Sequence, residues 1–84
     1  ERDRMTTELT RRGFHVFPSA TNFLLVVPPA TGPDAATLHE RLKAANVFVR
    51  YFDAPRLKDK LRITIGTAQQ NDALLSALDE LAPA

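Results

Sequence analysis

The 84-residue chain contains no cysteine, so it holds neither a disulfide framework nor a thiolate metal site. Its two histidines, His15 and His39, lie far apart in the sequence and lack the spacing of metal ligands. Neither histidine has an evident partner for nucleophilic catalysis, and we expect ordinary surface or boundary positions for both. The sequence therefore predicts no metal site and no histidine-based catalytic group.

Glycine is also scarce, and Gly13, Gly32 and Gly66 stand too far apart to form a phosphate-binding loop. No apolar run approaches the roughly 18 residues that cross a bilayer, since the longest, 23–27, has the length of a strand. Eleven basic and ten acidic residues leave a net charge of +1, whereas nucleic-acid-binding proteins usually concentrate positive charge. We therefore predict neither a membrane nor a nucleic-acid partner.

The residues that are present fit one small globular domain over 1–84. The chain is 44% hydrophobic and 25% charged, as soluble domains usually are. A domain of this size buries only roughly 60% of the surface that its unfolded chain exposes, so we expect modest stability from it alone. Position 1 is not methionine and a helical pattern is already running there. We therefore expect a piece of a longer protein.

Periodicity and turn residues predict seven elements in the order helix, strand, strand, helix, strand, strand, helix. The expected strands are 14–17, 22–27, 47–52 and the stretch around 61–65, and the expected helices end at Gly13, run through 35–45 and follow Thr67. A turn is expected at 19–21. Strands that arrive in pairs favour an antiparallel or mixed sheet with helices on one face. The predicted fold class is thus α+β, a two-layer sandwich with a sheet of about four strands.

Local signals mark the ends of the expected helices. Thr31 and Asp34 are the candidate N-caps of the second helix, and Asn46 suits the left-handed residue that would close it. Thr67 and Gln70 have the spacing of a capping box before the last helix. These signals predict the helix boundaries independently of any tertiary contact.

Two arginines are the candidate binding residues, because each lies inside a predicted strand. Leu61 and Ile63 alternate with Arg62, so the arginine projects from the face opposite the apolar one. A guanidinium there is either a solvated surface group, which strand geometry alone favours, or a fixed donor fork for a carboxylate or phosphate. Arg50 lies in the preceding strand, and Asn22 is a polar neighbour. If the two strands are adjacent, both guanidiniums can converge on one anion. No catalytic constellation is predicted within this chain.

Three segments of the sequence carry a resemblance to a known family. Residues 61–67, Leu-Arg-Ile-Thr-Ile-Gly-Thr, followed by Gln69-Gln70-Asn71, closely resemble the C-terminal end of the histidinol-phosphate aminotransferase family. Residues 20–25 resemble its Asn-Phe strand, and 46–52 resemble its strand that carries an arginine. The resemblance spans about residues 5–82, although Asn46 stands where glycine is common and Lys60 where an aromatic residue is common.

The resemblance implies the small C-terminal domain of a fold-type-I enzyme that uses pyridoxal 5'-phosphate in a separate large domain. It implies transfer of an amino group between histidinol phosphate and 2-oxoglutarate, a step of histidine biosynthesis, by a cytoplasmic homodimer. Arg62 would receive the anionic group of the amino substrate, and Arg50 would help to recognise its phosphate, with Asn22 nearby. Lys43, Lys58 and Lys60 lie in no recognisable cofactor motif. We therefore expect no cofactor binding and no transamination by these 84 residues alone.

Two alternatives stay open at this point. The chain also resembles, more loosely, other aminotransferases and a branch of threonine-phosphate decarboxylases. A free-standing binding module, such as an RNA-recognition sheet or a small-molecule sensor, would instead use Phe48, Phe52 and Arg50 on one strand face as a stacking platform. The near-neutral charge and the order of the elements argue against the RNA module.

Overall fold

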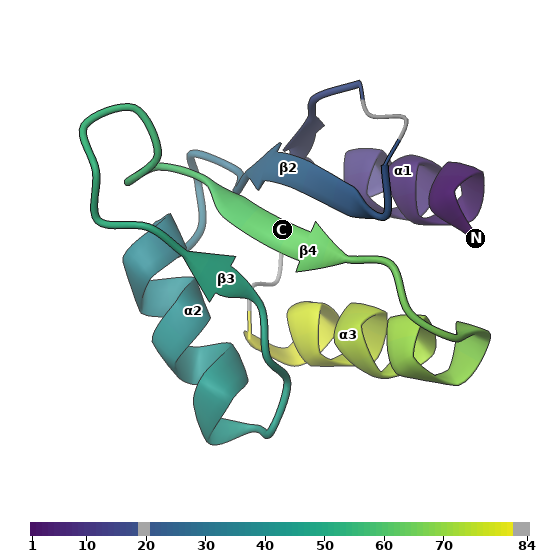
Figure 1. The fold of residues 1–84 in the computed structure, drawn as a ribbon. Coiled ribbons are helices and arrows are strands. Elements are labelled where there is room, and N and C mark those ends of the chain that lie inside the picture. Colours follow the sequence, from purple (N-terminus) through teal and green to yellow (C-terminus); the bar gives the residue numbers. More distant parts are fainter. Residues whose placement is uncertain (19–20, 82–84) are drawn as a thin grey trace.

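An antiparallel sheet with helices on one face forms the fold of the computed structural model, which describes residues 1–18 and 21–81 (Figure 1). In chain order, the described residues form α1 (Arg2–Arg11), β1 (His15–Val16), β2 (Phe23–Val27), α2 (Ala35–Ala44), β3 (Arg50–Tyr51), β4 (Leu61–Thr64) and α3 (Ala68–Leu81). The order of strands in the sheet is β1-β2-β4-β3, and each neighbouring pair is antiparallel. The predicted α+β class is confirmed. None of the described helices is long and apolar enough to cross a membrane.

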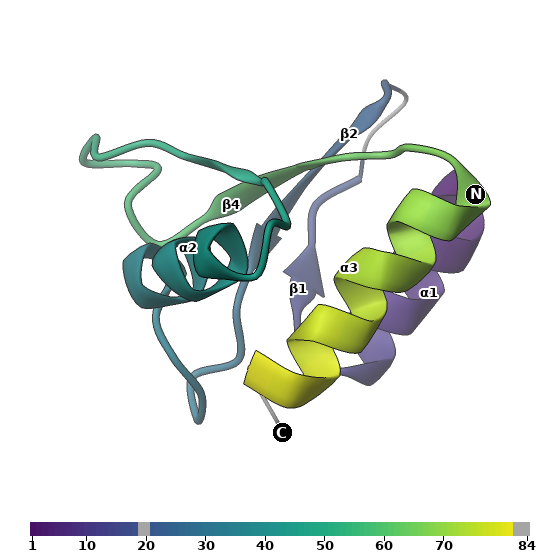
Figure 2. The same cartoon turned by 90° about the horizontal axis from the view of Figure 1, so that it is seen from below.

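The core lies between the sheet and the three helices, which are all on the same side of β2 and β4 (Figure 2). Alternate residues of the two central strands face this core, so Leu24 of β2 and Ile63 of β4 are at most 2% exposed. From the helices, Met5, Leu9 and Leu42 are fully buried against them. The residues between these strand positions project from the other, outer face, which no described helix covers.

The residues at the boundaries of the helices take the conformations and contacts that the local sequence predicts. Asp34 caps α2, since its Oδ1 accepts a hydrogen bond from the N–H of Thr37 at 2.8 Å. Asn46, with a φ of 63°, takes the left-handed conformation just after α2, which asparagine tolerates better than most residues. Gly13 follows α1 with a φ of 90°. These three predictions are confirmed.

The predicted third strand, 47–52, is too long, because only Arg50 and Tyr51 pair with β4. β3 is an edge strand, so it has a neighbour on one side alone. The N–H of Val47 donates instead to the carbonyl of Leu42 at the end of α2, at 2.8 Å. This hydrogen bond ties the segment before β3 to the helix and not to the sheet.

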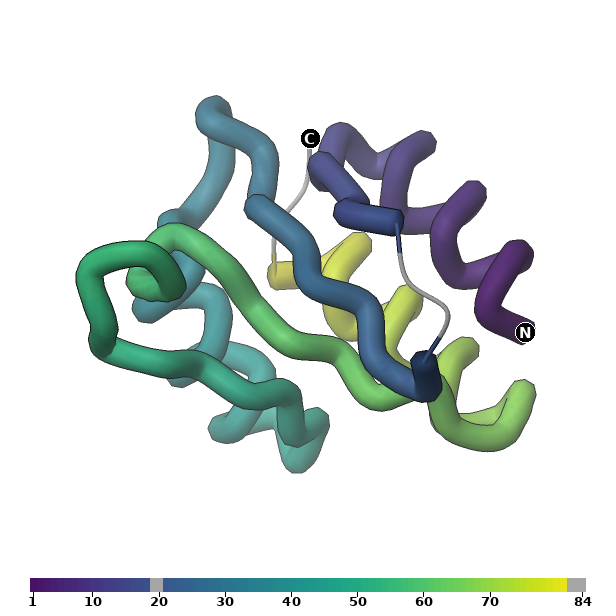
Figure 3. Tube along the Cα trace, turned by 45° about the horizontal axis from the view of Figure 1, so that its top comes forward, coloured from purple at the N-terminus to yellow at the C-terminus, as the bar shows by residue number. Residues whose placement is uncertain are grey.

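The other strand boundaries differ from prediction by at most one residue. β1 pairs over two residues, although the N–H of Phe17 still donates to the carbonyl of Leu25 at 3.0 Å. β2 and β4 run side by side through the middle of the sheet (Figure 3), and the N–H of Ile65 donates to the carbonyl of Asn22 just beyond their last pair. The predicted turn at 19–21 falls mostly on residues 19 and 20, which lie outside the described residues.

Candidate anion-binding site

Arg50 and Arg62 lie directly opposite each other on β3 and β4. Residues that are paired across two antiparallel strands project to the same face of the sheet. That face is the outer one, because Leu61 and Ile63, on either side of Arg62, are buried in the core. The structure therefore brings together the two arginines that the sequence singles out.

The two guanidiniums have no countercharge in the described part of the chain. Arg4, Arg11 and Arg12 all pair with carboxylates at 2.6–2.9 Å, whereas neither Arg50 nor Arg62 takes part in such a pair. Like charges directly opposite each other destabilise a sheet. An anion supplied from outside these residues would relieve that repulsion.

Aromatic rings flank the guanidinium of Arg62. Its Cζ lies 4.5 Å from the ring centroid of Phe23 and 5.4 Å from that of Phe52. The Cζ of Arg50 lies 5.8 Å from the centroid of the same Phe52 ring. We call these four residues the outer-face cluster. Phe23 is the member that sequence reasoning missed, because the contact depends on the register of β2 against β4.

Only one nitrogen of Arg62 is enclosed. Its Nε is buried and has no hydrogen-bond partner among the described residues. The two terminal nitrogens are not fully buried and make no hydrogen bond with the described residues. These two nitrogens can form a bidentate contact with a carboxylate or phosphate.

Asn22 makes no hydrogen bond with either arginine among the described residues. It precedes β2 in an exposed position, and its backbone carbonyl accepts the N–H of Ile65. The residue of β2 opposite Arg62 is Leu25, three positions further along, although the Arg62 guanidinium lies against the ring of Phe23, next to Asn22. A contact between Asn22 and the same ligand stays a prediction.

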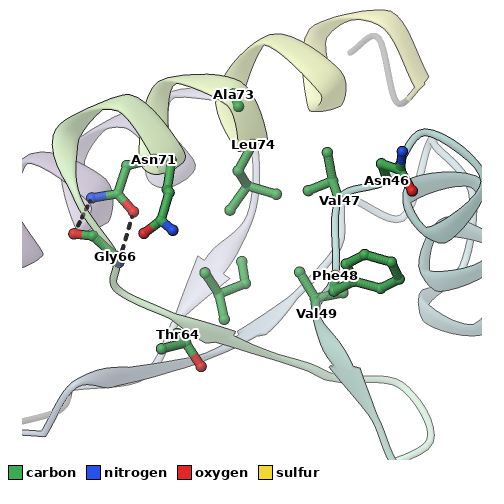
Figure 4. A pocket seen from close by; sticks show the side chains of 11 residues that line it. Asn46, Val47, Phe48, Val49, Thr64, Gly66, Asn71, Ala73 and Leu74 are labelled. Atoms are coloured by element: carbon green, nitrogen blue, oxygen red, sulfur yellow. Dashed lines mark hydrogen bonds between the residues drawn. The ribbon is translucent and has the colours of Figure 1, made fainter.

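The end of the Gly-Thr…Gln-Gln-Asn motif has a structural role that sequence reasoning missed. Asn71 is only 2% exposed, and its side chain brackets Gly66: Oδ1 accepts the N–H at 3.0 Å and Nδ2 donates to the carbonyl at 3.2 Å (Figure 4). Nδ2 also donates to Oε1 of Glu1 at 2.7 Å. These bonds fix the angle between the end of β4 and the start of α3.

The capping box beside this bracket is confirmed. The N–H of Gln70 donates to Oγ1 of Thr67 at 3.2 Å, and the N–H of Thr67 donates to Oε1 of Gln70 at 2.9 Å. A Cβ on Gly66 would fall 2.2 Å from that Oε1 and 3.2 Å from Cβ of Gln70. Glycine at 66 therefore leaves room for the box to close.

A hollow of about 380 Å³ lies near the motif, between α3, the end of β4 and the segment before β3 (Figure 4). Apolar side chains such as Val47, Val49 and Leu74 line much of it, and no charged residue does. Neither Arg50 nor Arg62 is among its lining residues. The hollow is therefore distinct from the candidate anion site.

Both histidines lie outside the outer-face cluster. His15 is exposed and its ring lies edge-on to Phe17, with centroids 4.6 Å apart. His39 is partly buried beside Tyr51, with centroids 5.8 Å apart. The predicted surface and boundary positions agree with this placement.

Comparison with known proteins gives the family. The sequence pattern of the aminotransferase class I and II family matches residues 1–78. The chain belongs to that family. It is 48% identical over 80 residues to histidinol-phosphate aminotransferase 1 of Trichormus variabilis and 46% identical over 80 residues to histidinol-phosphate aminotransferase 2 of Burkholderia mallei. Each alignment covers 95% of this chain and 22% of the relative, so the chain spans about a fifth of the length of these aminotransferases.

A solved aminotransferase structure has the same fold over nearly the whole chain. The crystal structure of a Burkholderia pseudomallei protein described as an aminotransferase, at 2.60 Å resolution, superposes with a TM-score of 0.79 and 33% sequence identity. The match covers 94% of this chain and 23% of the other. The resemblance inferred from the three sequence segments is thus confirmed at the level of the family.

Proposed function

We propose that this chain is the small C-terminal domain of a histidinol-phosphate aminotransferase, and that Arg62 and Arg50 bind the anionic groups of its substrates. The observation that carries the proposal is the directly opposed arginine pair on the uncovered face, with no carboxylate partner among the described residues. The names of the relatives support the choice of enzyme. In this assignment, Arg62 receives the carboxylate or phosphate of the amino substrate and Arg50 contributes to phosphate recognition.

An arginine pair suits a site that must accept two substrates in turn. Histidinol phosphate carries its negative charge on one phosphate group, whereas 2-oxoglutarate carries it on two carboxylates, so the two dianions differ in shape. A guanidinium fork binds either a carboxylate or a phosphate through two parallel hydrogen bonds, which fix orientation as well as charge. Orientation matters because a reacting group held in the productive geometry reacts faster than one that is free to turn.

The described residues do not fit the family's cofactor, pyridoxal 5'-phosphate. The chain has three lysines: Lys43 and Lys58 are exposed, and Nζ of Lys60 is occupied by Asp59 and the carbonyl of Arg56, both at 2.9 Å. None lines the 380 Å³ hollow. We therefore assign the cofactor lysine to the large domain, and this chain's part in the reaction is to bind and orient the substrate.

Replacement of Arg62 by alanine in the full-length enzyme tests the assignment. Loss of a charge-assisted contact of about 1.5–3 kcal/mol should lower kcat/KM for histidinol phosphate by roughly 10- to 150-fold. Cofactor occupancy, measured by absorbance, should be largely kept, because the arginine contacts substrate only. An equal loss of cofactor and of substrate use would contradict the role of Arg62. Arg56→Ala, at an exposed position of the turn before β4, is the matched control.

Replacement of Arg50 by alanine tests whether this arginine recognises the phosphate group of the substrate. It should weaken the use of histidinol phosphate more than that of an unphosphorylated amino substrate, because the assigned contact is to the phosphate. Equal losses for both substrates would contradict that assignment.

The nearest alternative keeps the family and changes the reaction, to another amino acid's transamination or to decarboxylation of a threonine phosphate. A substrate panel on the full-length protein distinguishes these activities. The family match favours all of them over a free-standing binding module. We further propose that the full-length protein is a cytoplasmic homodimer.

A further inference from the structure

We propose that Phe23 and Phe52 are positioning residues that hold the guanidinium of Arg62 in one orientation by stacking against it. The inference rests on the proposed function, because it explains how the substrate-binding arginine is kept in place. It adds two aromatic residues that support the substrate-binding arginine without binding the substrate themselves. The contacts, the register and the enclosed Nε of Arg62 carry it.

The register places the two rings on opposite diagonals of Arg62. On β2, Leu25 is directly opposite Arg62, so Phe23 lies two residues from that position, opposite Thr64. On the other side Arg50 is opposite, and Phe52 lies two residues beyond it. Diagonal positions on adjacent antiparallel strands are within reach of aromatic side chains. One ring therefore approaches the guanidinium from each flanking strand.

Both distances are those of a cation–π contact. A guanidinium within about 6 Å of a ring centroid is attracted by the negative face of the ring, and the two centroids lie 4.5 and 5.4 Å from Cζ of Arg62. Arginine also stacks flat on aromatic faces, a geometry that the lysine ammonium lacks. Two such contacts restrict rotation of the guanidinium plane, while its terminal nitrogens are not fully buried.

Rings position a cation without neutralising it. Just after α1, Arg12 is held by the carboxylates of Glu8 and Asp79, which compensate its charge. A carboxylate beside Arg62 would compete with the substrate anion for the same donors. Because Phe23 and Phe52 hold Arg62 through uncharged faces, its full positive charge stays available for the ligand.

Phe52 is shared by the two arginines and Phe23 is not. The Phe52 centroid lies 5.4 Å from Cζ of Arg62 and 5.8 Å from Cζ of Arg50. Phe52 therefore sets the orientation of both guanidiniums, whereas Phe23 acts on Arg62 alone. Loss of the Phe52 ring should impair binding through both arginines, and loss of the Phe23 ring should impair mainly binding through Arg62.

A simple packing role is the competing explanation, and substitutions at Phe23 in the full-length enzyme separate the two. Phe23→Leu keeps the apolar bulk but removes the π face, and Phe23→Tyr keeps the face. Loss of one cation–π contact should raise KM for histidinol phosphate by about 2- to 5-fold in the leucine variant, with kcat changed less. The tyrosine variant should recover most of the loss. Phe48→Leu is the control, because Phe48 is 73% exposed and lies within range of no guanidinium in the described residues.

Fluorinated phenylalanines at position 23 give a second readout that packing alone would not move. Each added fluorine weakens the negative face of the ring with little change in size. The inhibition constant of inorganic phosphate, measured in competition with histidinol phosphate, should rise stepwise with fluorination. The melting temperature of each fluorinated variant should change no more than that of the Phe48→Leu control.

The outcomes distinguish this inference from the proposed function. An inhibition constant that does not change with fluorination, or equal KM values for the leucine and tyrosine variants, overturns the positioning role. This holds even if Arg62→Ala still lowers kcat/KM for histidinol phosphate. Wild-type kinetics in Arg62→Ala would overturn the proposed function, and this inference with it.

Discussion

Arg62 owes its position to the alternation of strand residues, and that much is visible in the sequence. Period-two alternation with Leu61 and Ile63 places the side chain on the outer face, and the same rule places Arg50 there once β3 and β4 are paired. The contact with Phe23 is not visible in the sequence, because a shift of one residue in register would turn that ring to the core. Sequence reasoning therefore found the charged half of the cluster and missed one of the rings that flank it.

Asn71 is a second residue whose role cannot be predicted from the sequence alone. The sequence marks it as part of a motif, but it gives no reason for an asparagine inside a helix. The structure supplies one, since both polar atoms of its buried side chain are bonded to Gly66. Replacement of Asn71 would leave the N–H of Gly66 without this acceptor.

We predict that Asn71→Ala destabilises the junction of β4 and α3 by about 1–3 kcal/mol, because the partly buried N–H of Gly66 loses its acceptor. Hydrogen exchange of amides 66–71 in the full-length protein measures this directly and should accelerate. Gln69→Ala, exposed in the first turn of α3, is the control and should leave exchange nearly unchanged. Equal exchange rates in the two variants would show that the hydrogen bonds between Asn71 and Gly66 do not stabilise this junction.

At the scale of elements, local signals gave the ends of the helices and tertiary contacts decided the strands. The caps at Asp34 and Thr67 use side chains within three residues of the backbone groups that they satisfy, so they can be predicted from sequence. The extent of β3 depends on what lies beside it. As an edge strand whose preceding segment is bonded to α2, it pairs over two residues instead of six.

The packing of α1 against α3 includes a charged contact that the sequence does not reveal. Arg12 donates to Asp79 of α3 through Nε at 2.8 Å and Nη2 at 3.0 Å, and its Nη1 donates to Glu8 at 2.8 Å. The hydrogen bonds of Glu8 with Arg11 and Arg12 lower the pKa of its carboxyl from 4.5 to about 2. The pKa of Asp79 is lowered as well, chiefly by its bond to Arg12.

These shifts predict how the contact depends on pH. Folded-state pKa values below the unfolded ones contribute stability at pH above the unfolded values, and the contribution is lost as pH falls toward the folded values. The melting temperature of Arg12→Leu should therefore lie below that of the wild type at about pH 7, and the gap should narrow as pH falls below about 4.5 toward 3. Arg2→Leu, in α1 and with no ion pair among the described residues, is the control. A gap that stays constant with pH would mean that Arg12 acts by packing alone.

At the scale of the whole molecule, the helices cover one face of the sheet and leave the other uncovered (Figure 2). The outer face carries two arginines with no carboxylate partner among the described residues and the ring of Phe23, which is 39% exposed. The chain also spans about a fifth of the length of its aminotransferase relatives. A surface of this kind suits a domain whose ligand site is completed by another part of the protein.

We predict that these 84 residues alone, mixed with pyridoxal 5'-phosphate, give no strong absorbance band of a lysine-linked aldimine. The physical reason is that none of Lys43, Lys58 and Lys60 lies in a pocket that would exclude water and hold the cofactor in place. A full-length enzyme provides the positive control. A strong band from the isolated chain would contradict the assignment of the cofactor site to the large domain.

We propose that Arg50 and Arg62 jointly hold one anion on the outer face of the sheet. A crystal structure of the full-length enzyme with histidinol phosphate tests it most directly. We predict substrate oxygens at about 2.7–3.2 Å from terminal nitrogens of both arginines, with the Phe23 ring still against Arg62. A substrate whose phosphate and remaining anionic atoms lie away from both guanidiniums would contradict the account.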